Sequence, residues 1–114
     1  MIDRTNHQWM ADLHEDSPMR IQAADDLHEF LERGLYHYLS HTRNDLADSS
    51  AVELRHMAQE HAEESLYQVL DSLPLFRDTS QFTTWAAKFA ARVATADLKC
   101  ARSMHLEPEQ LTDG

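Results

Sequence analysis

Residues that interrupt regular secondary structure are scarce in this chain, which has only two glycines and three prolines among 114 residues. A turn-dense all-β fold needs many more of them, and a glycine-rich loop for nucleotide phosphates needs several glycines close together. We therefore expect an all-α domain. The length allows one small domain with a modest core and leaves no room for a second sizeable one.

Four segments carry apolar residues at spacings of three and four, the pattern of an amphipathic helix. The first predicted helix is short and covers residues 6–14, where Thr5 and Gln8 have the spacing of a capping box. Trp9 and Leu13 lie four apart on one of its faces, so Trp9 is expected to dock on the core. The second helix is predicted to begin with Ser17 as its cap and Pro18 at its first position, and to end near residue 40.

A polar loop over residues 42–50 precedes the third predicted helix, for which Asp48 or Ser49 is the expected cap and Pro74 the limit. Ser80 is the predicted cap of the fourth helix. These four segments give a small bundle of three main helices plus a short N-terminal helix. The expected core positions are Ile21, Ala24, Leu27, Leu31, Leu35 and Tyr38 in the second helix, Val52 or Leu54, Met57, His61, Ala62, Leu66, Val69 and Leu73 in the third, and Phe82, Trp85, Phe89, Val93, Ala96 and Cys100 in the fourth.

Charge is distributed unevenly along the chain, whose net charge is −10. The first 75 residues carry five basic and fifteen acidic side chains, whereas residues 76–105 carry five basic and two acidic ones, a net +3. A basic segment on an acidic body favours a local contact with nucleic acid, although ordinary helix-surface charges give the same pattern. The acidic end, residues 106–114, is predicted to be a linker or tail outside a domain that covers residues 1–105.

The sequence also limits the compartment of the protein and its chemistry. No apolar run has the roughly 18 to 20 residues of a membrane-spanning helix, and the first residues lack the apolar segment of a signal peptide, so we expect a soluble, cytoplasmic protein. A single cysteine, Cys100, forms no internal disulfide. No nucleophile elbow or similar framework is present, so we expect no enzymatic activity.

Eight histidines raise the alternative of a metal-binding helical bundle. His37 and His41 are four residues apart, and Glu53 and His56 have the Glu-x-x-His spacing of bundles with two metal ions. Such bundles draw ligands from four helices, however, and Asp97 is the one ligand-type carboxylate of the fourth predicted helix. We therefore expect no metal and no other cofactor, with most of the histidines at the surface.

The most specific signal lies in residues 70–85, which read Leu-Asp-Ser-Leu-Pro-Leu-Phe-Arg-Asp-Thr-Ser-Gln-Phe-Thr-Thr-Trp. This segment resembles region 2 of the extracytoplasmic-function (ECF) sigma factors of bacterial RNA polymerase, within the sigma-70 family. Their typical pattern is Leu-(Asp/Arg)-x-Leu-x-x-Phe-Arg-Gly-(Glu/Asp)-Ser-x-Phe-x-Thr-Trp. The segments at residues 62–70, 9–13 and 31–35 also resemble this family, so the likeness covers most of residues 5–106.

The resemblance implies two partners for a domain without catalytic activity. The helix that contains residues 62–70 would dock on the clamp helices of the large subunit of core RNA polymerase. The following loop would hold an unstacked base of the promoter minus-ten element, and basic residues of the next helix would contact phosphates. The implied polymerase-binding residues are Glu63, Glu64, Tyr67, Gln68 and Asp71. The implied DNA-binding residues are Phe76, Arg77, Asp78, Thr79, Ser80, Thr83, Thr84, Trp85, Lys88, Arg92, Lys99 and Arg102.

Several positions depart from the family pattern. Asp78 replaces the usual glycine, Thr79 the usual carboxylate and Gln81 a common arginine, and residues 99–102 replace a denser basic cluster. Aspartate tolerates the left-handed backbone conformation better than most residues, so the loop can keep its shape without glycine. Family members continue into a second helical domain, which leaves an excised fragment and a naturally short protein as alternatives. A further alternative is a degenerate sigma-like module that binds a regulator, such as an anti-sigma factor, but no promoter.

Overall fold

The computed structural model describes residues 4–41 and 50–96. Its elements are α1 (Asn6–Leu13), α2 (Arg20–His41), α3 (Ala51–Asp71) and the short 3-10 helix η2 (Leu73–Leu75), followed by a helix over residues 82–96 that we call the C-terminal helix. These ranges contain no β-strand. The fold is therefore the predicted all-α bundle of three main helices plus a short N-terminal helix.

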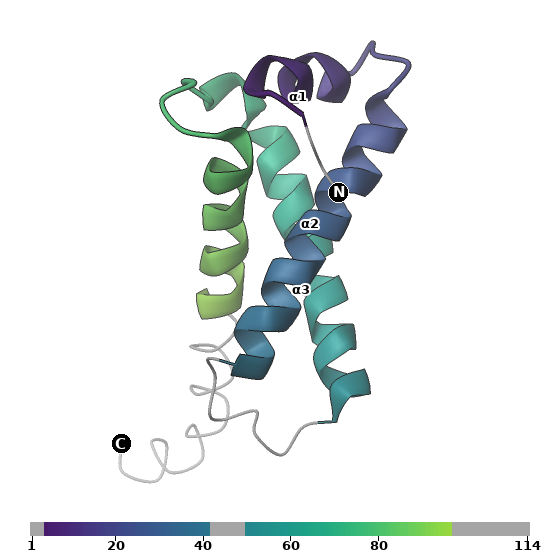
Figure 1. Cartoon of the computed structure of the whole chain (residues 1–114), viewed down its shortest axis with the longest axis vertical. Helices are drawn as coiled ribbons and strands as arrows, with labels where there is room; N and C mark the ends of the chain where they lie inside the picture. Colours follow the sequence, from purple (N-terminus) through teal and green to yellow (C-terminus); the bar gives the residue numbers. More distant parts are fainter. Residues whose placement is uncertain (1–3, 42–49, 97–114) are drawn as a thin grey trace, which may run out of the picture.

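The three long helices form the body of the molecule, and α1 lies across one end of it (Figure 1). α2 packs against both α3 and α1. The segment between α3 and the C-terminal helix turns at the same end of the bundle as α1 (Figure 1). This topology places α1, an early segment, beside the loop that follows η2. None of the described helices is both long enough and apolar enough to cross a membrane.

Side-chain caps define where the helices begin. The predicted capping box of α1 is confirmed, since the Thr5 side chain accepts a hydrogen bond from the Gln8 N–H and the Gln8 side chain accepts one from the Thr5 N–H. The predicted cap of α3 is wrong by one or two residues. Ser50 caps α3, in place of Asp48 or Ser49, because Glu53 lies three residues after it and closes a second capping box. The Ser17 hydroxyl accepts from the Met19 N–H at 3.0 Å in the turn before α2.

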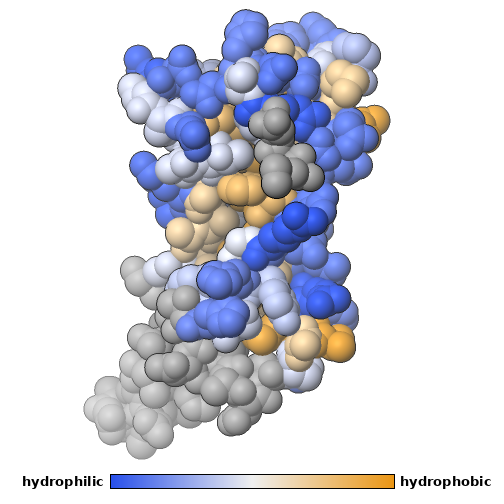
Figure 2. All heavy atoms as spheres, viewed as in Figure 1, coloured by the Kyte–Doolittle hydropathy of each residue, from blue (hydrophilic) through white to orange (hydrophobic). Residues whose placement is uncertain are grey.

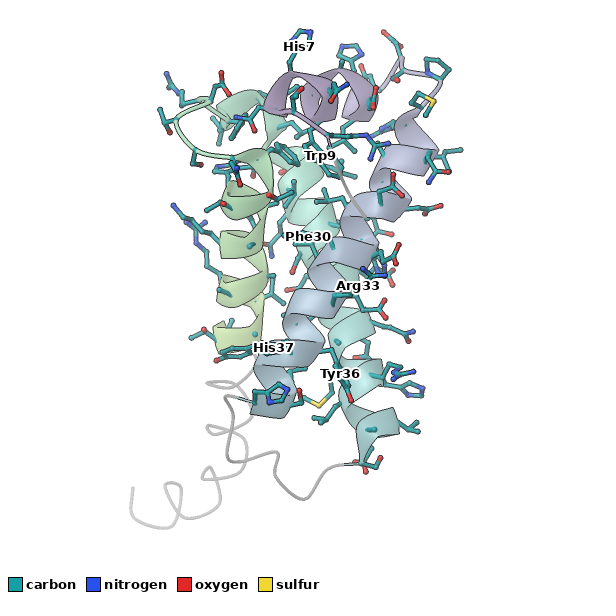
Figure 3. The ribbon with its side chains drawn as sticks, viewed as in Figure 1. His7, Trp9, Phe30, Arg33, Tyr36 and His37 are labelled. Atoms are coloured by element: carbon teal, nitrogen blue, oxygen red, sulfur yellow. The ribbon has the colours of Figure 1, made fainter. Side chains whose placement is uncertain are left out.

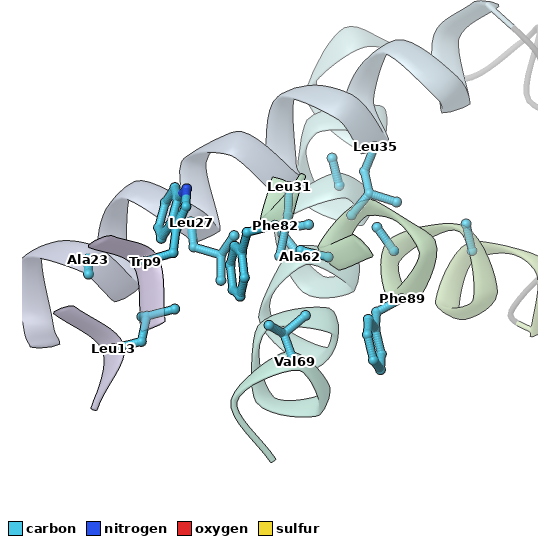
Figure 4. Close-up of a cluster of buried hydrophobic side chains, with 14 of the residues drawn as sticks. Trp9, Leu13, Ala23, Leu27, Leu31, Leu35, Ala62, Val69, Phe82 and Phe89 are labelled. Atoms are coloured by element: carbon cyan, nitrogen blue, oxygen red, sulfur yellow. The ribbon is translucent and has the colours of Figure 1, made fainter. Parts of the chain in front are cut away.

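The buried core lies along one face of each helix (Figure 4). Of the predicted core positions, Leu27, Leu31 and Leu35 of α2 are buried, but Ile21 is 80% exposed. Ile21 is six residues before Leu27, and at about 100° per residue this spacing turns it about 120° away from the buried face. The buried residues of the long helices are Ala23, Leu27, Leu31, Leu35 and Leu39 of α2, Leu54, Ala58, Ala62, Ser65 and Val69 of α3, and Phe82, Ala86, Phe89, Ala90, Val93 and Ala94 of the C-terminal helix.

The face of α3 also differs from the prediction in detail. Leu54 is buried and Val52 is 66% exposed, so Leu54 is the core member of that predicted pair. Met57, His61, Leu66 and Leu73 are half-buried, while the small residues Ala58 and Ser65, which were not predicted, are fully buried. The buried Ser65 hydroxyl donates to the His61 carbonyl at 2.6 Å, which satisfies its polar group within the helix.

Two further core predictions concern the C-terminal helix. Ala96 was predicted to be buried and is exposed, and Trp85 is half-buried. Cys100 lies outside the described residues. Three of the six buried positions of this helix are alanines, whose small side chains leave room for the larger Phe82 and Phe89 in the core.

Candidate nucleic-acid interface

A cluster of aromatic rings supports the loop that follows η2. Phe76 lies 5.4 Å from Phe82 and 5.1 Å from Trp85 between ring centroids, and Trp85 lies 4.9 Å from Phe89. On the other side, Trp9 of α1 stacks on Phe82 at 5.2 Å. Phe82 is buried within the cluster, whereas Phe76 and Trp85 are half-buried and keep part of their surface accessible. The cluster therefore fixes two rings at the surface beside the loop.

The loop itself covers residues 76–81 and has a defined backbone shape. At its start, the Phe76 N–H donates a hydrogen bond to the Leu73 carbonyl of η2 at 3.1 Å. Asp78 has a φ of 60° and is the one non-glycine residue with positive φ in the described part of the chain. Asp78 stands where the sequence pattern that this segment resembles has a glycine, and aspartate adopts the left-handed conformation more readily than most residues. Asp78 therefore makes a left-handed turn without glycine, and the likeness of this loop to that of the ECF sigma factors stays a prediction.

The cap of the C-terminal helix comes from α1 and not from the loop. Ser80 was predicted to cap this helix, but its hydroxyl contacts the Gln81 carbonyl at 3.4 Å. Instead, the Asn6 side-chain oxygen accepts a hydrogen bond from the Phe82 N–H at 2.7 Å. Asn6 Nδ2 also donates to the Ser80 carbonyl at 2.8 Å and to Asp78 Oδ1. The Ser80 prediction is therefore wrong, because a residue more than 70 positions away supplies the acceptor.

Most of the residues implied for DNA contact are accessible. Arg77, Asp78 and Thr79 are exposed on the loop, and Ser80 is half-buried. On the C-terminal helix, Thr84, Lys88 and Arg92 are exposed and Thr83 is half-buried. Lys99 and Arg102 lie outside the described residues.

The three described cations of this region are available to a charged partner. Within the described residues, Arg77, Lys88 and Arg92 form no ion pair with a carboxylate. Arg92 lies over the Phe89 ring, with its guanidinium carbon 5.3 Å from the ring centroid. The start of the C-terminal helix, with its partial positive charge, lies at the end of the loop that carries Arg77. This arrangement suits phosphate groups.

The residues implied for polymerase docking lie on the exposed face of the second half of α3. Glu63, Glu64, Tyr67, Gln68 and Asp71 are all exposed. Tyr67 is 62% exposed, and its hydroxyl lies 3.5 Å from Glu63 Oε1. Leu75 of η2, which the sequence analysis did not single out, is 66% exposed. We use the name docking surface for these six residues, which combine two apolar side chains with a polar rim.

The histidines do not form a metal centre within the described residues. His37 and His41 pair their rings at 4.5 Å between centroids, but both are exposed at the end of α2. Glu53 is engaged in the capping box of α3. No three His, Cys, Asp or Glu side chains come together there as metal ligands.

A separate apolar groove of about 160 Å³ lies between α2 and the C-terminal helix (Figure 2). Phe30 points from α2 into this region (Figure 3), and Gly34 borders open space, since a Cβ atom there would meet nothing within 4 Å. The other side of the groove is formed by Ala87 and Ala91. It lies on the side of the bundle, away from the loop.

Arg4 links α1 to α2 beside Trp9, which is one ring of the aromatic cluster. Its Nε donates to Asp12 at 2.9 Å and its Nη1 to Asp26 at 2.7 Å, while its guanidinium carbon lies 4.9 Å from the Trp9 ring centroid. Burial lowers the pKa of Arg4, but the hydrogen bonds to Asp26 and Asp12 outweigh burial and raise the pKa above its ordinary value. The hydrogen bond from Arg4 lowers the pKa of Asp26, against the opposing effect of burial.

Comparisons of the chain with models of known protein families, with curated proteins and with solved structures find no match. No similarity to a known protein therefore assigns a role to the residues of this site. The sequence analysis missed Asn6 and Leu75. The Asn6 contacts join residues far apart in the chain, and no local spacing could have indicated them. Leu75 could have been found as an apolar residue that follows a proline outside any predicted helical stripe.

Proposed function

We propose that this chain binds core RNA polymerase and reads a single-stranded promoter minus-ten element, as region 2 of a sigma factor does, without catalytic activity of its own. The observation that carries the proposal is the loop over residues 76–81. It is exposed at one end of the bundle, rests on the aromatic cluster, and has Asp78 in the left-handed conformation at the position of the family's glycine. Such a function would place the chain in the cytoplasm.

The chemistry of the loop suits an unstacked base. A base that has left its stack needs a flat apolar surface for its face and hydrogen-bonding groups for its pairing edge. The accessible parts of Phe76 and Trp85 supply the first, and the exposed side chains of Asp78 and Thr79 supply the second. Lys88 and Arg92 on the adjacent helix would contact phosphates, which position the strand without reading its sequence.

The docking surface has the composition of a protein interface, with apolar anchors inside a polar rim. Tyr67 and Leu75 are the exposed anchors, and the helical α3 face that carries Tyr67 suits contact with another helix. The net charge of −10 disfavours non-specific DNA binding by the isolated domain. Attachment to the polymerase would therefore supply the local concentration that the charge of the domain does not.

The first prediction tests polymerase docking. Replacing Glu64 by Ala and Gln68 by Arg together should weaken binding to core RNA polymerase by about tenfold or more, which is about 1.4 kcal/mol. Thermal unfolding should barely change, because exposed substitutions shift stability by about 0.5 kcal/mol or less. Glu60→Ala with Gln59→Arg is a matched control, with the same charge change at exposed positions nearer the start of α3. Equal binding by the two double variants would contradict the docking assignment.

The second prediction tests base reading by the loop. Changing Asp78 to Gly and Thr79 to Glu, the residues typical of the family, should alter the order of affinities among single-stranded minus-ten variants. Contact with a base edge is worth about 1 to 3 kcal/mol, so relative affinities should change roughly tenfold. Lys88→Ala should instead weaken all variants about equally. Fluorescence anisotropy with short oligonucleotides, with core polymerase present, measures both effects.

Circular dichroism of each loop variant provides the control for folding. An unchanged order of affinities in a folded loop variant would contradict base reading. If polymerase binding remained while the wild-type protein showed no preference among the oligonucleotides, the result would favour the sigma-like interaction module.

A further inference from the structure

The side chain of Asn6 joins α1 to the proposed base-reading loop. A neutral amide side chain offers two N–H donors and one carbonyl acceptor. In Asn6 the acceptor binds the Phe82 N–H, and Nδ2 donates to the Ser80 carbonyl and to Asp78 Oδ1. One side chain of α1 therefore holds the loop at its turn, at its end and at the start of the next helix.

A hollow of about 210 Å³ lies between α1 and the loop. Asn6, His7 and Met10 line it from α1, and Phe76 and Asp78 line it from the loop. Met10 and Phe76 are half-buried and give it apolar walls, whereas His7 and Asp78 are exposed and give it polar groups. The hollow is smaller than the roughly 300 to 1,000 Å³ of a typical small-molecule site, so it suits a single planar ring with one polar edge.

We propose that α1 forms the second wall of the base-reading site and that Asn6 is its positioning residue. The inference rests on the proposed function and replaces part of its base contacts with a ligand position. One unstacked base lies in the hollow, with its face on Phe76 and Met10 in place of Trp85, and with its polar edge near Asp78 and His7 in place of Thr79. Asn6 acts through the loop, because its polar atoms are already engaged by Asp78, Ser80 and Phe82.

The backbone of Asp78 explains why the loop needs such a residue. A left-handed conformation is less favourable than a right-handed one for a residue with a side chain, and glycine is absent here. The hydrogen bond from Asn6 to Asp78 Oδ1 fixes this turn, and the bond to Ser80 fixes the end of the loop. A binding site held in its bound shape avoids the cost of ordering when the ligand arrives. Without Asn6, the loop would lose conformational entropy each time that it binds a base, and binding would be weaker.

Asn6→Ala in the full chain tests the proposal. The variant should remain folded, with a lower melting temperature and faster hydrogen exchange at the Phe82 amide. With core polymerase present, its affinity for the preferred minus-ten oligonucleotide should fall about tenfold, while the least preferred one should bind almost as before. The preference is then lost, in contrast to the uniform weakening expected for a lost phosphate contact.

Gln8→Ala is the matched control on the same helix. It removes half of the α1 capping box, so it also lowers stability, but Gln8 makes no hydrogen bond to the loop. It should keep the order of affinities. Loss of that order in Gln8→Ala as well would assign the effect to general destabilisation and overturn the positioning role.

Reversal of the Asn6 and Asp78 side chains provides a rescue. Asn6→Asp removes both donors and places a second carboxylate against Asp78, so it should abolish the preference. Adding Asp78→Asn restores one donor and acceptor pair in the opposite direction, and asparagine also tolerates positive φ. The double variant should regain part of the ranking that Asp78→Asn alone shows, because the bond to the Ser80 carbonyl stays lost. A double variant with no more preference than Asn6→Asp would count against the proposal.

The results separate this inference from the proposed function. If the wild-type protein on core polymerase shows no preference among the oligonucleotides, the proposed function fails, and this inference fails with it. If the wild-type protein shows a preference and folded Asn6→Ala keeps it, the proposed function stands and the role of Asn6 and α1 is overturned.

Discussion

Replacing Trp9 by alanine is expected to lower the free energy of unfolding by about 3 to 5 kcal/mol. Trp9 is only 1% exposed, stacks on Phe82 and lies beneath the guanidinium of Arg4. Its removal leaves a cavity where α1, α2 and the C-terminal helix meet. Since small domains are stable by about 5 to 15 kcal/mol in total, the variant should lose a large share of its stability and unfold at a clearly lower urea concentration. Urea denaturation followed by circular dichroism measures the change.

Two other substitutions provide controls for Trp9. Trp9→Phe keeps an aromatic ring, and the Trp9 Nε1 atom is buried without a hydrogen-bond partner in the described part of the chain, so this change should cost less than about 2 kcal/mol. Ile21→Ala changes a large apolar residue that is almost fully exposed and should cost about 0.5 kcal/mol or less. A loss for Ile21 as large as that for Trp9 would contradict the observed placement of the core.

The stability of α1 matters for function because α1 contacts the candidate site in two ways. The Trp9 ring stacks on the Phe82 ring, and Phe82 in turn contacts the rings of Phe76 and Trp85. Asn6 fixes the loop directly. A helix of eight residues is too short to be stable alone, so packing and the capping box must hold it in place. Substitutions that weaken the α1 contacts should therefore change the structure of the loop before they unfold the bundle of three long helices.

Local spacing in the sequence predicted the features that depend on neighbouring residues. The Thr5 and Gln8 capping box and the buried Leu27, Leu31 and Leu35 follow from periodicity and short-range hydrogen bonding. Ile21 was misplaced because its spacing of six residues from Leu27 turns it about 120° away from the buried face of α2, where it is exposed. Which face of a helix is covered depends on how its neighbours pack against it, and the pattern of one helix does not determine that packing.

The candidate site shows the same division. The left-handed turn at Asp78 could be predicted, because the position matches a glycine of the family pattern and aspartate tolerates that conformation. The cap of the C-terminal helix could not, since Ser80 has the right residue type and position for a cap while the actual acceptor, Asn6, comes from α1. Sequence patterns show which polar groups need a partner, but only the fold shows which distant side chain reaches them.

Replacing Arg4 by methionine is expected to lower the free energy of unfolding at pH 7 by about 2 kcal/mol, between the values for exposed ion pairs and for charged hydrogen bonds away from water. The change removes hydrogen bonds to Asp12 and Asp26 and the contact with the Trp9 ring. It also leaves two carboxylates facing each other across α1 and α2 without a cation between them. Urea denaturation at a series of pH values measures the loss.

The pH dependence of unfolding shows how much of the stability lost in Arg4→Met comes from the interaction with Asp26. Arg4 lowers the pKa of Asp26 below its value in the unfolded chain, so this interaction stabilises the fold above about pH 4 and is lost as the pH falls through the lowered pKa. The difference in stability between wild type and Arg4→Met should therefore shrink as the pH falls below about 4 and through the lowered pKa of Asp26. Arg33→Met is the matched control, because Arg33 pairs with Glu29 on the exposed side of α2 and should cost only about 0.3 to 0.5 kcal/mol. An equal acid response of wild type and Arg4→Met would show that the Arg4 and Asp26 pair does not stabilise the attachment of α1.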